Sequence, residues 1–125
     1  MTSWSEDELS TIARTDELRI SSDTRDGTST KPVIIWVVRV ADDVFVRSVK
    51  GTAGGWFGAT RATGRGHIQI GGLERDVAFT AVGDPDLHAE ISSAFREKYS
   101  RYPAFTVDAV VTEDAVAATL QLTPR

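Results

Sequence analysis

The fold is decided by residues 32–49, which read PVIIWVVRVADDVFVRSV. Pro32 stands before a run rich in β-branched residues, Val33–Val40, at a position where a missing N–H does no harm to a strand ladder. Both faces of this run are largely apolar, so we expect a strand that is buried on both sides. Ala41-Asp42-Asp43 is typical of a turn, and Val44–Val49 is predicted to return as the second strand of an antiparallel hairpin.

The segments before this hairpin predict one helix and one strand. Ser5 and Glu8 form a capping-box pattern, which indicates the start of a short helix. Asp16–Ser22 alternates between apolar and polar residues and is predicted to be the first strand. Ser21–Lys31 is polar, contains a glycine and has no apolar period, so we interpret it as a loop.

The segments after the hairpin predict one long helix and two more hairpins. Asp84 is a good N-cap and Pro85 suits the first helical position, so a helix begins there, and Tyr102-Pro103 ends it. One hairpin turns at Gly71-Gly72 and the other at Glu113-Asp114. Their four strands are predicted over Gly66–Ile70, Leu73–Val82, Phe105–Thr112 and Ala115–Thr123.

Together these elements predict a mainly β protein with helices, an α+β fold. Seven short strands, an N-terminal helix and one helix inserted before the C-terminal hairpin indicate an antiparallel sheet closed into a small barrel. Most strand connections are too short for a crossover, which argues against a parallel sheet. Because 125 residues is the size of one ordinary domain, residues 1–125 are expected to form a single domain.

The composition excludes several classes of function. The chain has no cysteine and only two histidines, so a thiolate or histidine-rich metal site is excluded and no metal is expected. A net charge of −4 is a poor match to a nucleic-acid binder. No run of about 20 apolar residues is present, so no membrane span is expected. The N-terminus is polar and acidic, unlike a secretory signal, and a cytoplasmic protein is therefore predicted.

The middle of the chain is basic and free of acids. Val44–Leu73 contains four bases and no acid, whereas residues 1–30 contain seven acids and three bases. Lys50–Arg65 holds five glycines and is either a long loop or a loop with a short helix around Trp56–Ala62. Backbone N–H groups and basic side chains can bind phosphate oxygens, so Arg47–Gly51 is a candidate anion cradle. The alternative is a solvated loop whose arginines pair with the acidic N-terminal third.

Aromatic and ionisable side chains offer further candidates, each with a structural alternative. Trp56-Phe57 could stack on a flat ring or pack on a dimer partner, or it could anchor the loop in the barrel mouth. His67 could contact a ligand or act as an acid or base, or it could be a half-exposed polar residue. His88 is expected to face solvent and has no assigned role. Asp42-Asp43 and Glu113-Asp114 occupy turn positions that favour aspartate for backbone reasons.

The chain also resembles a known family of bacterial proteins. The stretches that carry the resemblance are Trp36–Val40, Val46–Gly51, Gly55–Phe57, Phe95–Tyr99 and Ala118–Arg125. They resemble a family of short bacterial proteins known only as a domain of unknown function. That family is similar to the flavin-binding split β-barrels, the superfamily of the pyridoxamine phosphate oxidases and the deazaflavin-dependent nitroreductases.

The resemblance implies a split β-barrel that forms a homodimer, with a flavin held at the subunit interface. In such proteins a basic residue and a hydroxyl near the end of a barrel strand hold the cofactor phosphate. Arg47, Ser48 and Lys50 occupy the comparable place here. Trp56-Phe57 looks like the tryptophan–tyrosine pair of deazaflavin reductases, although Gly58 replaces the asparagine that usually follows. The glycine–arginine–x–x–glycine signature of those reductases is missing.

Two functions from different classes remain open at this point. The first is a flavin- or deazaflavin-binding oxidoreductase, with FMN or a deazaflavin as cofactor. Its expected cofactor-contacting residues are Arg47, Ser48, Lys50, Gly51, Trp56 and His67. The second is a non-enzymatic split-barrel dimer that binds another small anionic ligand or a protein partner.

Overall fold

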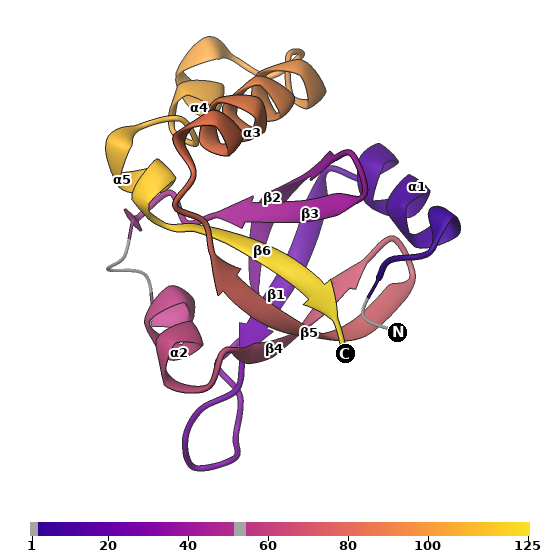
Figure 1. The fold of residues 1–125 in the computed structure, drawn as a ribbon, viewed down its shortest axis with the longest axis vertical. Coiled ribbons are helices and arrows are strands. Elements are labelled where there is room, and N and C mark those ends of the chain that lie inside the picture. Colours follow the sequence, from indigo (N-terminus) through magenta and orange to yellow (C-terminus); the bar gives the residue numbers. More distant parts are fainter. Residues whose placement is uncertain (1–2, 52–54) are drawn as a thin grey trace.

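The structure, a computed structural model, describes residues 3–51 and 55–125. In this part of the chain six strands form a closed barrel, drawn in Figure 1. The strands are β1 (Glu17–Ser22), β2 (Val33–Val40), β3 (Asp43–Arg47), β4 (Arg65–Ile70), β5 (Leu73–Ala81) and β6 (Thr119–Pro124). The helices are α1 (Glu6–Arg14), α2 (Gly55–Thr63), α3 (Pro85–Lys98), α4 (Ala104–Asp108) and α5 (Glu113–Ala117). The predicted α+β barrel is therefore confirmed, with six strands in the described residues in place of the seven predicted.

The barrel order is β1-β2-β3-β6-β5-β4, and β4 pairs with β1 to close it. Every pairing is antiparallel. The predicted hairpin forms between β2 and β3, with Val38 opposite Phe45. The return strand ends at Arg47, two residues earlier than predicted, so Ser48 and Val49 leave the sheet at the open end of the hairpin.

Local signals place the helices at their observed starts. The predicted capping box forms before α1, because the Ser5 backbone N–H donates to Glu8 at 2.9 Å and the Glu8 N–H donates to Ser5 at 3.2 Å. The Asp84 carboxylate caps α3 by accepting from the Asp86 N–H at 3.0 Å. Of the two interpretations of the glycine-rich segment, the loop with a short helix is confirmed, since α2 spans Gly55–Thr63.

Two apolar clusters lie on opposite faces of the β2–β3 hairpin. Val44 and Val46 belong to the barrel interior, together with side chains from α1 and α2. Phe45 belongs to a second cluster that covers the outside of the hairpin beneath α3. Figure 1 shows α3, α4 and α5 gathered on this side of the barrel. The alternation along β3 therefore decides which side chains meet the helices, and Arg47 follows Phe45 onto the helix side.

The predicted C-terminal hairpin is wrong. Phe105–Thr112, predicted as the first strand of this hairpin, instead contains most of α4 and the residues that follow α4. Glu113-Asp114, predicted as the turn, forms the start of α5. Thr112 caps α5 by accepting from the Ala115 N–H at 3.1 Å, and the alanines that follow favour a helix. Only Thr119–Pro124 is a strand, and its neighbours are β3 and β5, which lie far away in sequence.

The prediction for β2 needs a smaller correction. Val37 and Val38 are buried, one on each face, as expected. Ile34, near the start of the strand, is exposed. The strand is therefore buried on both sides only at its centre, and its first half contributes an apolar side chain to the surface. No helix in the described residues is long and apolar enough to cross a membrane.

Candidate functional site

Three large apolar side chains are exposed in the described residues, and all three line one surface groove. Ile34 is 53% exposed, Val49 is 55% exposed and Phe105 is 79% exposed. They line two adjoining cavities that share Ile34, Ile35 and Val49. Exposed apolar concavities of this kind are typical of ligand or partner sites, which makes this one the candidate site. We refer to the two cavities together as the apolar groove.

The groove has two ends of different character. The lysine end has a volume of about 530 Å³, and the helix end has a volume of about 420 Å³. The lysine end is lined by Thr30, Lys31, Val33, Ile34, Ile35, Ser48, Val49, Lys50 and Trp56. The helix end is lined by Ile34, Ile35, Trp36, Arg47, Val49, Phe105, Thr106, Ala109 and Val110. Three of these residues are cationic and none is acidic.

The hairpin itself brings the two lysines to one end of the groove. Because β2 and β3 run antiparallel, the residues before β2 and after β3 meet where the hairpin opens. Lys31 comes from the first of these positions, and Ser48 and Lys50 come from the second. Both lysines are exposed, and neither forms an ion pair with a carboxylate in the described residues. This end of the groove therefore presents unneutralised positive charge.

Gly51 fixes the path of the chain just beyond Lys50. Its φ is +65°, a conformation that residues with a side chain rarely adopt. An added Cβ would also lie 3.2 Å from the Cβ of Asp114. The Gly51 N–H donates to the Ser48 carbonyl at 3.0 Å, and the Ser48 N–H donates to the Ala118 carbonyl at 3.2 Å. Gly51 thus has a backbone role next to the groove.

Trp56 is shared between the groove and the barrel interior. Both Trp56 and Phe57 are buried in the interior cluster, with their rings edge to face at 5.9 Å. The Ser22 hydroxyl donates to the Trp56 carbonyl at 2.8 Å, which ties α2 to β1. The structure therefore gives the pair the anchoring position foreseen as the structural alternative, while Trp56 also lines the lysine end.

Arg47 lies inside the protein, and its guanidinium is held by protein atoms. Nε donates to the Thr119 hydroxyl at 2.9 Å. Nη1 donates to the Ser92 hydroxyl at 2.8 Å and to the Val110 carbonyl at 3.0 Å. Nη2 donates to the His88 carbonyl at 3.1 Å and lies 3.5 Å from His88 Nδ1. The expected role of Arg47 as a donor in an anion cradle is therefore not supported, because its donors already bind protein atoms.

The charge of Arg47 nevertheless acts on the helix end of the groove. Burial, together with the nearby charge of Arg96, lowers the pKa of Arg47 to about 10. The group stays cationic at neutral pH. It lies 5.6 Å from the centre of the Phe95 ring, and no carboxylate of the described residues pairs with it. Arg47 therefore adds positive charge near the groove without offering a free N–H fork.

The acidic N-terminal third pairs with arginines from outside the basic segment. Glu6 pairs with Arg39 at 3.5 Å, and Asp23 pairs with Arg125 at 3.8 Å. Two further pairs join Glu8 to Arg75 and Asp16 to Arg101. In the described residues, none of these contacts involves the four bases between Val44 and Leu73. These ion pairs therefore do not support the alternative in which those four bases neutralise the N-terminal acids.

The two histidines lie outside the groove lining. His67 is on β4, where Nδ1 donates to Asp76 at 3.0 Å and Nε2 lies 3.8 Å from Glu74. The hydrogen bond from His67 lowers the pKa of Asp76. The expectation that His88 faces solvent is wrong, because this half-buried ring donates from Nε2 to the Val82 carbonyl at 2.8 Å and contacts Arg47.

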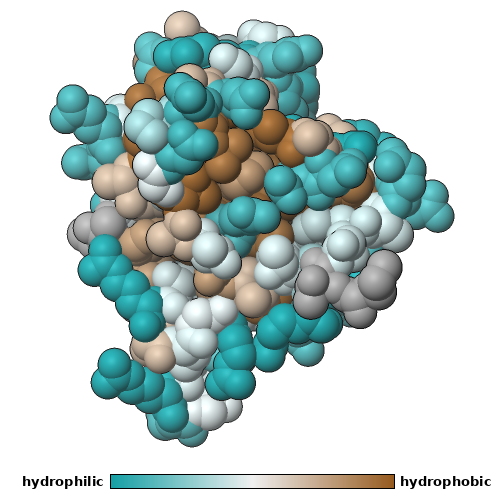
Figure 2. All heavy atoms as spheres, in the orientation of Figure 1, coloured by the Kyte–Doolittle hydropathy of each residue, from teal (hydrophilic) through white to brown (hydrophobic). Residues whose placement is uncertain are grey.

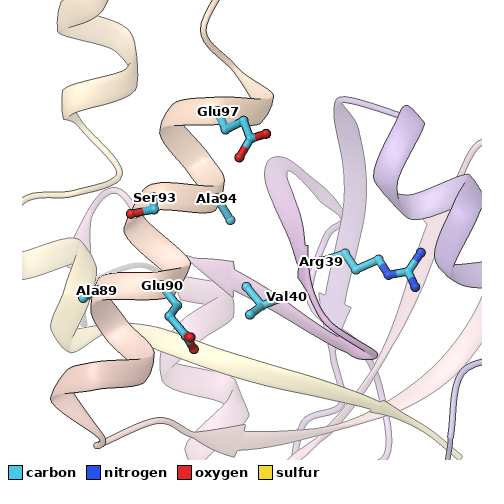
Figure 3. A pocket seen from close by; sticks show the side chains of 7 residues that line it. All are labelled: Arg39, Val40, Ala89, Glu90, Ser93, Ala94 and Glu97. Atoms are coloured by element: carbon cyan, nitrogen blue, oxygen red, sulfur yellow. The ribbon is translucent and has the colours of Figure 1, made fainter.

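A different groove lies between α3 and β2, and its chemistry is unlike that of the apolar groove. Figure 3 shows Glu90 and Glu97 on α3, with Arg39 on β2 across the gap. Figure 2 shows apolar side chains at the surface in this region, between the helices and the strands. The Arg39 guanidinium already contacts Glu6, Asp42 and the Ala41 carbonyl. Two carboxylates and an occupied arginine make this groove a poor match to an anionic ligand.

Of the predicted cofactor residues, the structure brings Ser48, Lys50 and Trp56 together. Arg47 lines the helix end, and Gly51 shapes the adjacent turn. The sequence analysis missed Lys31 and Phe105. The position of Lys31 follows from the hairpin register, since it precedes one strand while Lys50 follows the other. Nothing in the local pattern of Phe105 marks it as exposed. The sequence predicts a strand over Phe105–Thr112, whereas Phe105 lies on α4.

A family model described as "Uncharacterized protein conserved in bacteria (DUF2255)" matches residues 8–122. The chain belongs to this family. The expected membership is thus confirmed over nearly the whole sequence of this DUF2255 protein. No curated protein matches it in sequence.

Several solved structures share the fold of this DUF2255 protein. HutZ, the haem storage protein from Vibrio cholerae, matches with a TM-score of 0.68 at 11% identity, over 96% of this chain and 89% of that one. An F420 reductase matches with a TM-score of 0.59 at 14% identity, over 98% and 94%. An FMN-binding protein from Syntrophomonas wolfei matches with a TM-score of 0.62 at 14% identity, over 94% and 79%. At these identities the likeness shows the fold alone, and it confirms the split β-barrel.

Proposed function

We propose that this protein binds a flavin-type cofactor, FMN or the deazaflavin F420, in the apolar groove and acts as an oxidoreductase. The observation that carries the proposal is the groove itself. Unneutralised lysines lie at one end, apolar walls line the rest, and no carboxylate lines it. A flavin has the same division between a phosphate-bearing tail and a flat ring. The F420 and FMN proteins that share the fold add support.

The phosphate is assigned to the lysine end. Lys31 and Lys50 supply charge, and the hydroxyls of Thr30 and Ser48 lie in the same lining. Charge-assisted hydrogen bonds to phosphate are among the stronger polar contacts that a protein makes. Arg47, which was expected to share this role, has its donors bound to protein atoms, so its part in the proposal is to add positive potential.

The ring is assigned to the apolar wall beside the lysines. Ile35, Val49 and Trp56 line this part of the groove, and Trp56 provides an aromatic surface. The volume of the lysine end lies within the range of about 300–1,000 Å³ that is usual for small-molecule sites. When bound there, a flavin supplies hydride or electron transfer, and the chain's own residues hold and orient it. His67 lies on β4 with acidic neighbours and has no part in this assignment.

The proposal includes a homodimer that covers the groove. The exposed side chains of Ile34, Val49 and Phe105 would lie in water in a monomer. A second copy that packs on this face would remove them from water and would close the open side of the cofactor site. This is the interface position that the resemblance to split barrels led us to expect.

The proposal is tested by titrating FMN and F420 into the purified protein while the cofactor fluorescence is followed. Binding in the micromolar range or tighter is expected. If neither cofactor binds up to about 1 mM, where the binding free energy is only about 4 kcal/mol, the proposal fails.

Activity is tested by adding NADPH anaerobically to the loaded protein. This addition should bleach the absorbance of bound FMN faster than that of free FMN. Binding without any reduction would support the alternative of a non-enzymatic ligand-binding dimer.

A further inference from the structure

We propose that the helix end of the apolar groove is a substrate subsite, and that it takes a planar apolar molecule that is neutral or negatively charged but not cationic. This inference rests on the proposed function, because it names the substrate class of the same site. The two ends share Ile34, Ile35 and Val49. A molecule at the helix end therefore lies directly beside a ring at the lysine end, as electron transfer between them requires.

The walls of the helix end favour an apolar ring. Phe105, Ala109 and Val110 form one side, and Ile35 and Trp36 belong to the other. Besides Arg47, the polar side chain in the lining is Thr106. A strongly polar molecule would lose its hydration here with few hydrogen bonds in return. The volume of about 420 Å³ has room for a molecule of one or two fused rings.

The charge of the ligand follows from the state of Arg47. This is the charged residue in the lining of the helix end, and it stays cationic at neutral pH. A cationic ligand would be repelled in a partly desolvated site that contains no compensating carboxylate in its lining. Since the N–H groups of Arg47 already donate to protein atoms, a carboxylate would gain favourable potential but no bidentate pair. A carboxylate also loses hydration in this apolar site, and this cost offsets the favourable potential, so a neutral ring and an anionic ring are expected to bind with similar affinity.

The helix end is also held in place before any ligand arrives. The Trp36 ring is stacked on Tyr99 at a centroid distance of 3.9 Å and an interplanar angle of 5°. The Val110 carbonyl on the opposite wall accepts from Arg47 at 3.0 Å. The wall that contains Trp36 is thus tied to Tyr99 at the end of α3, and the wall that contains Val110 is tied to Arg47 of β3. A site held in this way loses less conformational freedom when it binds a ligand.

The test uses three naphthalene probes of similar shape and different charge: 1-naphthalenemethanol, 1-naphthoate and 1-naphthylmethylammonium. Binding to the FMN-loaded protein is followed by naphthalene fluorescence at neutral pH. The alcohol and the carboxylate are expected to bind within about threefold of each other, and the ammonium probe about tenfold more weakly. Equal affinity for all three probes, or preference for the cation, would overturn the proposal.

Matched variants locate the site. Ala109→Phe places a ring inside the helix end and should weaken the alcohol probe at least about tenfold, whereas Ala104→Phe, the same change on an exposed residue of α4, should have no effect. Phe105→Ala removes a wall from an exposed position and should weaken the probe about threefold even if Ala109→Phe does not fold. Unchanged probe affinity in folded Ala109→Phe or in Phe105→Ala would overturn the subsite. FMN titration of the same samples is a separate readout, so loss of FMN binding alone counts against the cofactor proposal.

Discussion

Arg47 and Thr119 are cross-strand partners in the β3–β6 ladder, and Nε of the arginine donates to the threonine hydroxyl at 2.9 Å. This contact starts a network that continues to Ser92, Val110 and His88. The network joins the first residue of β6 to α3 and to the residues after α4. One side chain therefore connects this wall of the helix end both to the barrel and to α3, in addition to the apolar packing of Val107 and Val110.

Replacing Arg47 should mainly destabilise the fold. Arg47→Met keeps most of the side-chain length but leaves two hydroxyls and two carbonyls without their donor. Buried polar groups that lose a partner cost about 1–3 kcal/mol each before relaxation, so a loss of about 2–4 kcal/mol in the free energy of unfolding is expected. Urea denaturation measures it, with Arg65→Met at an exposed position of β4 as the control. A variant that keeps full stability and loses only FMN affinity would instead support the original phosphate role of Arg47.

Lys31 and Lys50 should act on the phosphate and not on the ring. Lys31→Ala and Lys50→Ala are each expected to weaken FMN binding about tenfold, which corresponds to about 1.4 kcal/mol. Neither should change the affinity for riboflavin, which has the same ring without the phosphate. Fluorescence titrations with the two ligands give both values, and Arg65→Ala controls for a general change of net charge. Equal losses for FMN and riboflavin would contradict the assignment of the phosphate to this end.

Two glycines should respond in opposite directions to the same substitution. A Cβ on Gly66 would lie 2.2 Å from the Ser21 carbonyl oxygen and 2.7 Å from the Phe79 ring, so Gly66→Ala should separate β4 from β1 and cost several kcal/mol. A Cβ on Gly58 has no neighbour within 4 Å, and the residue is in α2 with no positive φ. Gly58→Ala should therefore stabilise the protein by about 0.5–1 kcal/mol. Thermal unfolding of both variants measures the two effects, and unchanged stability of Gly66→Ala would contradict the close contact between β4 and β1.

Lys98 should make stability depend on pH in the alkaline range. Its ammonium donates to the carbonyls of Ile12, Thr15 and Val37 at 2.7–2.8 Å, and burial lowers the pKa of Lys98 to about 8 from an ordinary value of 10.5. Between pH 8 and pH 10 the unfolded chain keeps a proton that the folded chain has released. The free energy of unfolding of the wild type, relative to Lys98→Met, should therefore rise across this interval.

Urea denaturation at several pH values between 8 and 10 measures this difference. The interval stops at pH 10 because the neighbouring Tyr99, whose pKa is raised by burial, would oppose the trend at higher pH. A difference that stays constant or falls would mean that the three carbonyls hold the charged form of Lys98 strongly enough to outweigh burial.

Phe105 should control self-association. Phe105→Ser removes the most exposed of the large apolar side chains and should convert a dimer into a monomer at low micromolar concentration, with little change in the unfolding free energy of the monomer. Light scattering after size exclusion measures the mass. Ala104→Ser, on the same helix, is the control. A wild-type protein that is monomeric at high concentration would contradict the dimer without touching the groove assignment.

The sequence was sufficient for the parts of the fold that depend on neighbours along the chain. The β-branched run and the turn at Ala41-Asp42-Asp43 predicted the β2–β3 hairpin, and the capping residues Ser5 and Asp84 marked two helix starts. The C-terminal hairpin failed because β6 pairs only with strands that are distant in sequence. Local propensity in the preceding stretch could not separate short helices from a strand.

The candidate site was predictable where it lies on the hairpin and not where helices approach it. Ser48 and Lys50 were identified from the basic, glycine-rich segment and Trp56 from its aromatic ring, and all three line the groove. Arg47 was identified as a candidate, but the sequence does not show that α3 covers the face on which it lies. The same missing tertiary information hid Phe105, whose exposure follows from how α4 is docked.

The barrel closes through the β1–β4 ladder, so each of its six strands has a neighbour on both sides. Main-chain hydrogen bonds maintain this frame whatever side chains its outer surface bears. Residues 104–110 supply much of one groove wall and take no part in the ladder. Mutations in this seven-residue stretch can thus reshape the groove wall without removing a main-chain hydrogen bond of the barrel.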